Sequence, residues 1–203
     1  MTLSGPTVMP FKQIPAEHPL IVLWQSRWSE LAASNAFEHV LVHPGYANGS
    51  IVGFDDTSLP FRIQYEIEWD ENWCTREVEI DVAMGGRAHG FHLSVDEQAN
   101  WYDGEGREIG RLAGCRDVDI WPTPFTNTLA IRRLQLGGGD RQEIDVAYID
   151  ALAGELMQKR QAYTPLAGGD YRFESLESGF TARLTVDEYG LIVDYPGLFV
   201  RAG

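Results

Sequence analysis

Residues 61–69 read Phe61-Arg62-Ile63-Gln64-Tyr65-Glu66-Ile67-Glu68-Trp69, with large apolar side chains at every second position and polar side chains between them. Because successive side chains of a β-strand point to opposite faces, this alternation predicts a strand with one buried face and one face in water. Residues 78–84 alternate in the same way. Between the two segments, Asp70-Glu71-Asn72 predicts the turn of an antiparallel hairpin.

Further strands are expected along the rest of the chain, separated by turn residues about every 8–12 positions. They cover Phe91–Val95, Leu129–Leu136, Glu143–Ile149, Met157–Tyr163, Tyr171–Ser175, Phe180–Val186, Leu191–Tyr195 and Leu198–Arg201. So many amphipathic strands need a closed or doubly layered sheet to cover their apolar faces and edges. We therefore predict an all-β fold, with a many-stranded antiparallel sheet rolled into an open barrel.

The domain organisation is predicted from proline content and periodicity. Residues 1–23 carry four prolines and little periodicity, so we expect an irregular N-terminal leader. No linker-like run divides residues 24–203, which are predicted to form a single domain. A chain of 203 residues can bury roughly 70% of its unfolded surface, enough for a sizeable core.

The formal net charge of −14 argues against nucleic acid as a partner, because phosphate contacts need clustered Lys and Arg. It also disfavours binding to anionic membrane surfaces. The apolar run Leu20–Trp24 is too short for a signal core or a membrane span, so a cytoplasmic location is expected. There, Cys74 and Cys115 are predicted to be reduced thiols. The oligomeric state is left open.

Several segments carry a resemblance to a known family. They are Trp73–Arg76, Gly114–Ile120, Thr123–Leu129, Ile131–Leu134, Gln161–Tyr163, Val186-Asp187, Gly190-Leu191 and Asp194–Phe199. Together they resemble the family described as "putative glycolipid-binding", bacterial proteins that were formerly a domain of unknown function. The resemblance spans about residues 24–201. It implies a spirally rolled antiparallel sheet around an apolar cavity, similar in architecture to lipoprotein-carrier folds that hold acyl chains.

Two adjacent arginines, Arg132 and Arg133, lie inside the predicted strand Leu129–Leu136, so their side chains are expected on opposite faces. The inward arginine needs a carboxylate partner, because an unpaired buried charge is costly. Candidates for that partner are Asp117, Asp119, Asp187 and Asp194. Two interpretations stay open: an internal structural salt bridge, or an Arg–Asp pair at the cavity mouth that grips a phosphate or sugar head group.

The segment that precedes these arginines offers sugar-binding chemistry. Thr126 and Asn127 supply a hydroxyl and an amide, and Trp121 or Phe125 could provide a stacking platform. Thr and Asn equally satisfy local backbone groups in turns, so a structural role is the alternative. The full set of predicted ligand-binding residues is Arg76, Asp117, Asp119, Trp121, Phe125, Thr126, Asn127, Arg132, Arg133 and Asp187.

No metal site, cofactor or catalytic residue is predicted. His89 and His92 form the most closely spaced histidine pair, and on a strand their side chains point to opposite faces. The alternating carboxylates at Glu66, Glu68 and Glu77 fit a solvated sheet face.

These observations favour a non-catalytic binding protein for a glycolipid-like or other amphiphilic ligand. Its acyl chain is expected in the apolar interior, and its polar head near Arg132 or Arg133 and the Thr126/Asn127 segment. One alternative is an enzyme that acts on a lipid or sugar conjugate through Asp117, Asp119 or Asp187. The other alternative is a structural or interaction protein with a fully packed core. Two carboxyl groups converging in one pocket would favour the enzyme.

Overall fold

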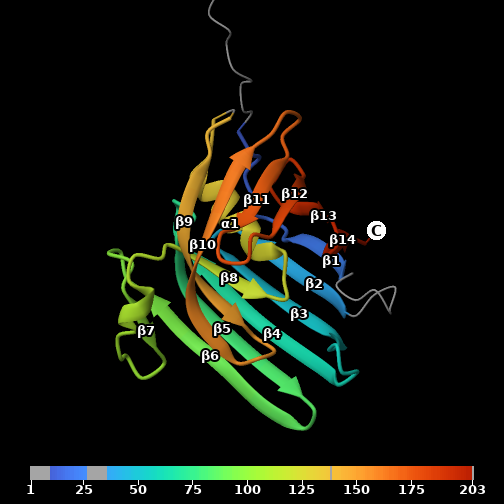
Figure 1. Ribbon diagram of the computed structural model, residues 1–203, viewed down its shortest axis with the longest axis vertical. Helices are drawn as coiled ribbons and strands as arrows, with labels where there is room; N and C mark the ends of the chain where they lie inside the picture. The colour runs from blue at the N-terminus through green and yellow to red at the C-terminus, as the bar shows by residue number, and fades with distance from the viewer. Residues whose placement is uncertain (1–9, 27–35, 138, 203) are drawn as a thin grey trace, which may run out of the picture.

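A computed structural model describes residues 10–26, 36–137 and 139–202. The described residues form one 14-stranded sheet in the order β7-β6-β5-β4-β3-β2-β1-β14-β13-β12-β11-β10-β9-β8 (Figure 1). The strands are β1 (Leu20–Ser26), β2 (Ala36–His43), β3 (Tyr46–Phe54), β4 (Pro60–Trp69), β5 (Thr75–Met84), β6 (Arg87–Val95), β7 (Trp101–Asp103), β8 (Asp117–Trp121), β9 (Gln142–Asp150), β10 (Glu155–Pro165), β11 (Tyr171–Ser175), β12 (Thr181–Val186), β13 (Ile192–Tyr195) and β14 (Phe199–Arg201). A short 3₁₀ helix covers Gly110–Leu112, and one α-helix, α1, covers Phe125–Leu134. The predicted all-β fold is confirmed.

The alternation at residues 61–69 has the predicted structural meaning. In β4, the five apolar side chains are 0–6% exposed and the polar side chains between them face solvent. Strand β5 pairs with β4 in antiparallel register, with Tyr65 opposite Ile80. Asp70 shapes the turn between them, since its Oδ1 accepts hydrogen bonds from the backbone N–H groups of Asn72 and Cys74, both at 2.9 Å.

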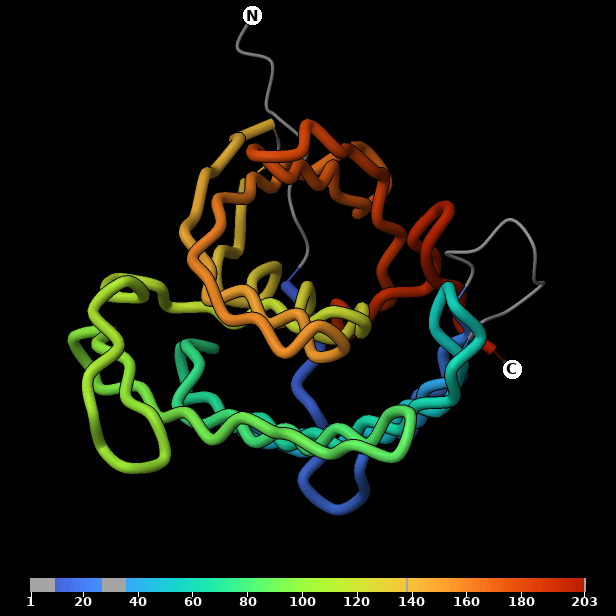
Figure 2. Tube along the Cα trace, turned by 60° about the horizontal axis from the view of Figure 1, so that its bottom comes forward, coloured from blue at the N-terminus to red at the C-terminus, as the bar shows by residue number. Residues whose placement is uncertain are grey.

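The sheet bends into two layers that face each other across the core (Figure 2). Strands β1–β7 form the N-terminal layer, and strands β8–β14 form the C-terminal layer, which curls around α1. Strand β8, which is last in the sheet order, lies beside the start of β5. Thr75 N–H donates to Arg116 O (3.0 Å), and Val118 N–H donates to Thr75 Oγ1 (3.1 Å). The sheet order is nevertheless linear, so the sheet stays open. Strands β8 and β9 are parallel, and every other strand pairing in the described residues is antiparallel.

The predicted strand at Leu129–Leu136 is wrong, because most of this segment belongs to α1. Residues 125–132 are all buried, since α1 lies between the two layers of the sheet. A helix that is buried on every side lacks the apolar stripe that identifies a surface helix in a sequence. The correction changes the geometry of Arg132 and Arg133, because consecutive residues of a helix point about 100° apart rather than to opposite faces.

The irregular leader predicted for residues 1–23 overlaps the first strand of the structure. Strand β1 runs from Leu20 to Ser26 and pairs with β2 and β14, so it crosses the boundary predicted at residues 23 and 24. Residues 10–19, which precede β1, are without regular strand or helix. Residues 1–9 of the predicted leader lie outside the described residues.

Candidate functional site

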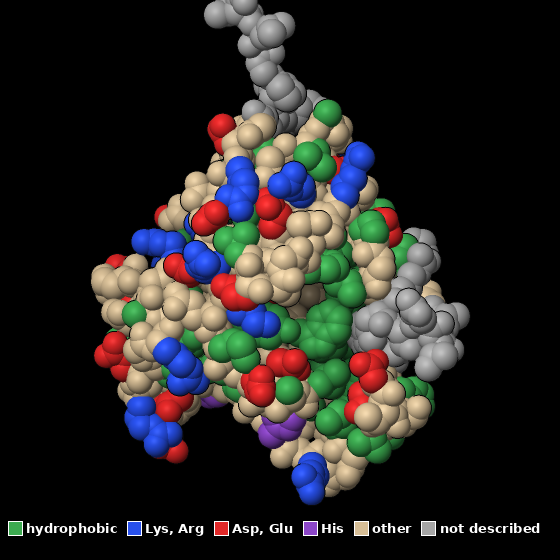
Figure 3. Space-filling model, viewed as in Figure 1, with side chains coloured by type: hydrophobic (Ala, Val, Ile, Leu, Met, Phe, Trp, Pro, Cys, Tyr) green, Lys and Arg blue, Asp and Glu red, His purple; other side chains and the backbone are tan. Residues whose placement is uncertain are grey.

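A cavity of about 240 Å³ lies inside the curl of the C-terminal layer, beside the N-terminal end of α1. Its walls come from β8, β9, β10, β11, β13 and β14, from the turn between β11 and β12, and from α1. The lining residues are Asp119, Ile120, Trp121, Thr123, Asn127, Tyr148, Lys159, Gln161, Phe173, Ser175, Ser178, Phe180, Tyr195, Leu198 and Phe199. Figure 3 shows apolar side chains gathered near the middle of one face of the molecule. The sheet therefore encloses a hollow that is open to solvent on one side.

One wall of this cavity is polar. We define the polar cluster as Asp119, Asn127 and Gln161, which line the cavity, together with Thr126 and Tyr163, which bond them from behind. Gln161 Nε2 donates to Asp119 Oδ2 (2.5 Å), and Thr126 Oγ1 donates to Asp119 Oδ1 (3.1 Å). The Tyr163 hydroxyl donates to Asn127 Oδ1 (3.0 Å) and lies 3.3 Å from Gln161 Oε1. These bonds join β8, α1 and β10 and hold the polar side chains in fixed positions.

An aromatic wall, which we define as Trp121, Phe173, Phe180, Tyr195 and Phe199, forms the other side. Tyr195 is its centre, with ring centroids 5.9 Å from Phe173, 6.0 Å from Phe199 and 6.2 Å from Phe180. Trp121 meets Phe199 edge-on at 5.8 Å. Such rings give a binding surface that is apolar, rigid and able to pack on the flat side of a ligand.

The charges of the cavity are unequal. Burial raises the pKa of Asp119, and the hydrogen bonds from Gln161 and Thr126 oppose that rise. Lys159 is partly exposed, and its Nζ lies 3.3 Å above the centre of the Tyr148 ring, a cation–π contact. Burial raises the pKa of Tyr195, whose hydroxyl therefore stays neutral. The cavity thus combines one partly buried carboxyl group, one lysine beside a tyrosine ring, and neutral hydroxyl and amide groups.

The comparisons with known proteins agree with this architecture. The family described as "Putative glycolipid-binding" matches residues 25–201. The chain belongs to this family. A solved structure, the crystal structure of a DUF1089 family protein from Pseudomonas aeruginosa, is similar, with 41% sequence identity and a TM-score of 0.81. The match covers 86% of this chain and 97% of that one. No functionally curated protein matches the chain.

In this member of the family, three of the predicted site residues line the cavity: Asp119, Trp121 and Asn127. Thr126 lies directly behind them, because its hydroxyl bonds Asp119 and accepts a hydrogen bond from Ile120 N–H (3.3 Å). Phe125 is fully buried and packs against Trp69, with ring centroids 5.9 Å apart. The other predicted residues, Arg76, Asp117, Arg132, Arg133 and Asp187, lie outside the lining.

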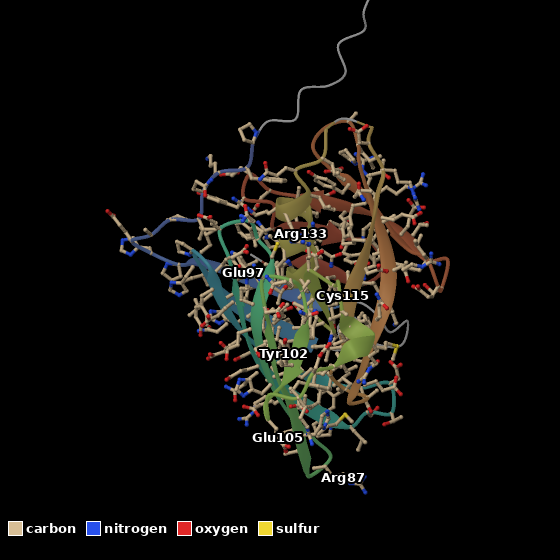
Figure 4. The ribbon with its side chains drawn as sticks, turned by 90° about the vertical axis from the view of Figure 1, so that its left-hand side faces the viewer. Arg87, Glu97, Tyr102, Glu105, Cys115 and Arg133 are labelled. Atoms are coloured by element: carbon tan, nitrogen blue, oxygen red, sulfur yellow. The ribbon has the colours of Figure 1, made fainter. Side chains whose placement is uncertain are left out.

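Arg133 is engaged with Asp117 in the interior. Its Nε donates to Asp117 Oδ1 (2.8 Å) and its Nη2 to Oδ2 (2.5 Å), a bidentate ion pair. The Asp117 side chain is 1% exposed and that of Arg133 is 17% exposed. Burial disfavours both charges, but the two hydrogen bonds favour them, so this geometry indicates an ionised pair that fastens α1 to β8. Figure 4 labels Arg133 beside the helix.

Arg132 holds backbone segments together. Its Nη1 donates to Lys12 O (2.8 Å) and to Tyr189 O (2.7 Å), and its guanidinium lies 4.1 Å from the centre of the Trp73 ring. Burial lowers the pKa of Arg132 to about 10, and the charge of Asp187 opposes this fall. This arginine therefore connects the segment before β1 to the turn between β12 and β13.

The remaining two predicted residues also have structural partners. Arg76 donates to Asp70 Oδ2 (2.6 Å) and to Asp96 O (2.7 Å). Asp187 accepts from Arg201 Nη1 (2.7 Å), and its other oxygen accepts the backbone N–H groups of Tyr189 and Leu191. Both residues fix turns at the ends of strands.

Sequence reasoning missed most of the lining. The residues that it did not select are Ile120, Thr123, Tyr148, Lys159, Gln161, Phe173, Ser175, Ser178, Phe180, Tyr195, Leu198 and Phe199. They come mainly from β9–β14 and meet the segment 119–127 only when the sheet curls. Inward-facing pairs such as Phe173 and Ser175 at alternate positions of one strand were the available signal.

A second buried acid lies close to the cavity and was also missed. Glu38 on β2 is 4% exposed, and its Oε1 accepts hydrogen bonds from Tyr65 OH (2.5 Å) and from Thr123 Oγ1 (2.7 Å). Its Oε2 is buried without a hydrogen-bond partner among the described residues. Burial raises the pKa of Glu38 to about 7, although the bonds from Thr123 and Tyr65 lower it. Thr123 links this acid to the cavity wall.

The position of Tyr65 depends on a glycine. Gly49 on β3 is directly opposite Tyr65 on β4, and a Cβ on Gly49 would overlap the Tyr65 ring. We expect Gly49→Ala to lower the free energy of unfolding by about 1–3 kcal/mol, because the ring must move and abandon Glu38. Denaturant titration measures the loss. Gly110→Ala is the control, since a Cβ there meets nothing within 4 Å, and equal losses in the two variants would contradict this account.

A cluster of possible metal ligands lies on the outer face, away from the cavity. Ligand atoms of Glu77, Glu79 and His92 lie within 4.8 Å of one another, and the three side chains are about half-exposed. His92 Nε2 is 3.1 Å from Glu77 Oε1, while His89 bonds Ala151 O (2.8 Å) instead. We assign this cluster to a solvated acidic face.

No helix in the described ranges is both long and apolar enough to cross a membrane.

Proposed function

We propose that the protein binds a glycolipid-like or other amphiphilic ligand in the cavity between α1 and the C-terminal layer. The observation that carries this proposal is the combination of an aromatic wall and a hydrogen-bonded polar cluster around one open hollow. Binding sites for small molecules have this composition, with apolar walls and a few fixed polar groups. The family description supports the same class of ligand.

The proposal is limited to binding for a structural reason. An enzyme that cleaves a glycosidic bond in the usual way needs two carboxyl groups that flank the bond. Among the described residues that line the cavity, Asp119 is the one carboxyl group. Glu38 lies behind Thr123 and is not part of the lining, and neither is Asp117, which is bonded to Arg133. The observed geometry therefore favours ligand retention.

The role of the arginines in this proposal differs from the one that the sequence suggested. Arg133 and Arg132 are bonded to Asp117 and to backbone carbonyls, respectively, so we propose that they position α1 and its neighbours. The ligand-contacting residues that we propose are Asp119, Trp121 and Asn127, together with the new lining residues. A phosphate clamp at Arg132 or Arg133 would require these bonds to break.

The proposed function is tested by a substitution that fills the cavity with a larger side chain and leaves the described hydrogen bonds of its walls in place. Ser175 faces the cavity from β11 and is half-buried, so Ser175→Phe places a ring in the hollow. We expect the wild-type protein to bind at least one of n-octyl β-D-glucopyranoside, n-octyl phosphate and octanoate in isothermal titration calorimetry. Ser175→Phe should weaken that binding at least tenfold.

Ser94→Phe is the matched control, because Ser94 lies exposed on β6 and outside the cavity lining. It should bind the same amphiphile as the wild type does. Equal binding by the Ser175→Phe variant would place the ligand elsewhere, and no binding of any of the three compounds by the wild type would reject the proposed function.

A further inference from the structure

We propose that the ligand enters this cavity head first, with an uncharged polyhydroxylated head group against the polar cluster and its hydrocarbon tail leaving over Phe180. This inference rests on the proposed function and adds the orientation and the charge class of the ligand. It reverses the orientation expected from the sequence, in which the acyl chain filled the interior.

The polar cluster lies inside the cavity, whereas an apolar ring lies at its mouth. The polar side chains Gln161 and Asn127 are 3% and 6% exposed, so they lie in the inner part of the cavity, as deep as the apolar lining residues Ile120, Phe173, Tyr195 and Phe199 at 0–5%. Phe180, at the turn between β11 and β12, is 39% exposed and lies at the mouth. A hydrocarbon chain packed against the polar cluster would face amide and carboxyl groups and give them no hydrogen bonds, which is unfavourable.

The polar cluster has hydrogen-bonding capacity that its described bonds leave unused. Each oxygen of the Asp119 carboxylate accepts one described bond, and a carboxylate oxygen can accept about two. The amide nitrogen of Gln161 uses one N–H on Asp119 and has a second. Asn127 Nδ2 likewise has one N–H beyond the one that it gives to Pro124 O (3.3 Å). Adjacent acceptors and donors of this kind match neighbouring hydroxyl groups, each of which both donates and accepts.

The charges beside the polar cluster disfavour an anionic head group. An anionic head group at the polar cluster would lie beside the Asp119 carboxylate, and like charges at hydrogen-bonding distance repel each other. Arg133 is not available to neutralise such a head, because it is bonded to Asp117. Lys159 is the one Lys or Arg among the described lining residues, and it lies over the Tyr148 ring. An uncharged head avoids the repulsion and can still bond the free donors and acceptors of the polar cluster.

The volume of the cavity limits how much of a ligand it can enclose. The cavity measures about 240 Å³, which is below the range of about 300–1,000 Å³ of pockets that enclose a whole drug-sized ligand. A ligand that carries both a sugar ring and an alkyl chain must therefore extend out of it. The exit is apolar, since Phe180 lies 6.2 Å from Tyr195 and 6.4 Å from Phe173, and Leu198 is only half-buried. The tail can cover these side chains and remove them from water.

The experiment compares heads on one tail. Binding of n-octyl β-D-glucopyranoside, the corresponding galactoside, n-octyl phosphate and octanoate is measured by calorimetry below their critical micelle concentrations. We expect at least one glycoside to bind at least tenfold more tightly than both anionic compounds. Asp119→Asn keeps the shape of the side chain but removes acceptor capacity, and it should weaken glycoside binding at least tenfold. Lys159→Gln is the matched control at the same cavity and should change it less than threefold.

Orientation is measured on the wild-type protein, so the result does not depend on the folding of a variant. An alkyl glucoside with a nitroxide at the far end of its chain is bound, and the rate of its reduction by ascorbate is recorded. Tail-out binding predicts a rate within about twofold of the rate for the free compound. A strongly protected nitroxide, or anionic compounds that bind as tightly as the glycosides, would overturn this inference and leave the proposed function standing. Failure of all four compounds to bind would reject the proposed function as well.

Discussion

Replacement of Asp117 by alanine should lower the free energy of unfolding by about 3–5 kcal/mol, as expected for the loss of one partner of a buried ion pair. The reason is the environment of Arg133, whose guanidinium donates two hydrogen bonds to this carboxylate inside the protein. Without Asp117, the arginine keeps its charge and loses the group that compensates it. Denaturant titration of the wild type and the variant at pH 7 measures the difference.

Two controls separate burial from the mere presence of an ion pair. Asp103 also forms a hydrogen-bonded ion pair with Arg107 (2.8 Å), but the Arg107 side chain is 69% exposed, so Asp103→Ala should cost far less. The double replacement Asp117→Leu with Arg133→Met should recover much of the loss, because an apolar pair of similar size needs no charge compensation. Equal losses in Asp117→Ala and Asp103→Ala would contradict the account of a buried, ionised pair.

This ion pair also connects the stability of the fold to the proposed site. Asp117 and Asp119 point to the same side of β8, and α1 bonds the first through Arg133 and the second through Thr126. The helix is therefore attached to β8 at two points, and its N-terminal end is fixed beside the cavity. A ligand then meets side chains that are already in place, which reduces the ordering cost of binding.

The strands with regular alternation could be predicted from the sequence because one face of each is buried and the other is wet. The stretch Phe61–Trp69 is the clearest case, and β5 repeats it. Helix α1 could not be recognised in this way. Thr126, Asn127 and Arg132 are nearly as buried as Leu129, since α1 packs on both sides and its polar groups find partners on neighbouring strands and turns. Burial of polar residues erases the amphipathic pattern on which sequence interpretation relies.

The candidate site was predictable only in the segment that is continuous in sequence. Asp119, Trp121 and Asn127 were selected because their side chains offer binding chemistry within a few residues of one another. Gln161 meets Asp119 across 42 positions of the chain, and Tyr195 and Phe199 come from the last two strands. Those contacts depend on how the sheet curls, a global property that alternation within single strands does not encode.

Glu38 should make the protein less stable as the pH rises from about 4.5 to about 7. Burial raises the pKa of this carboxyl group to about 7 from an ordinary value of 4.5, so the folded state favours the protonated form. The stability that this preference provides is complete below pH 4.5 and is lost as the pH rises through 7. The two pKa values correspond to a loss of about 3 kcal/mol, at about 1.4 kcal/mol per unit.

The Glu38→Gln variant isolates this contribution, because it keeps the shape of the side chain and cannot titrate. Other acids titrate equally in both proteins, so the difference in unfolding free energy between wild type and variant should fall by about 3 kcal/mol from pH 4 to pH 8. A carbon NMR titration of the Glu38 carboxyl group should give a midpoint near 7. Tyr65→Phe removes a hydrogen bond to the carboxylate (2.5 Å) and should move that midpoint upward. If the difference stayed constant or increased with pH, the folded protein would have to stabilise a charged Glu38 through an interaction that the bonds from Tyr65 and Thr123 do not provide.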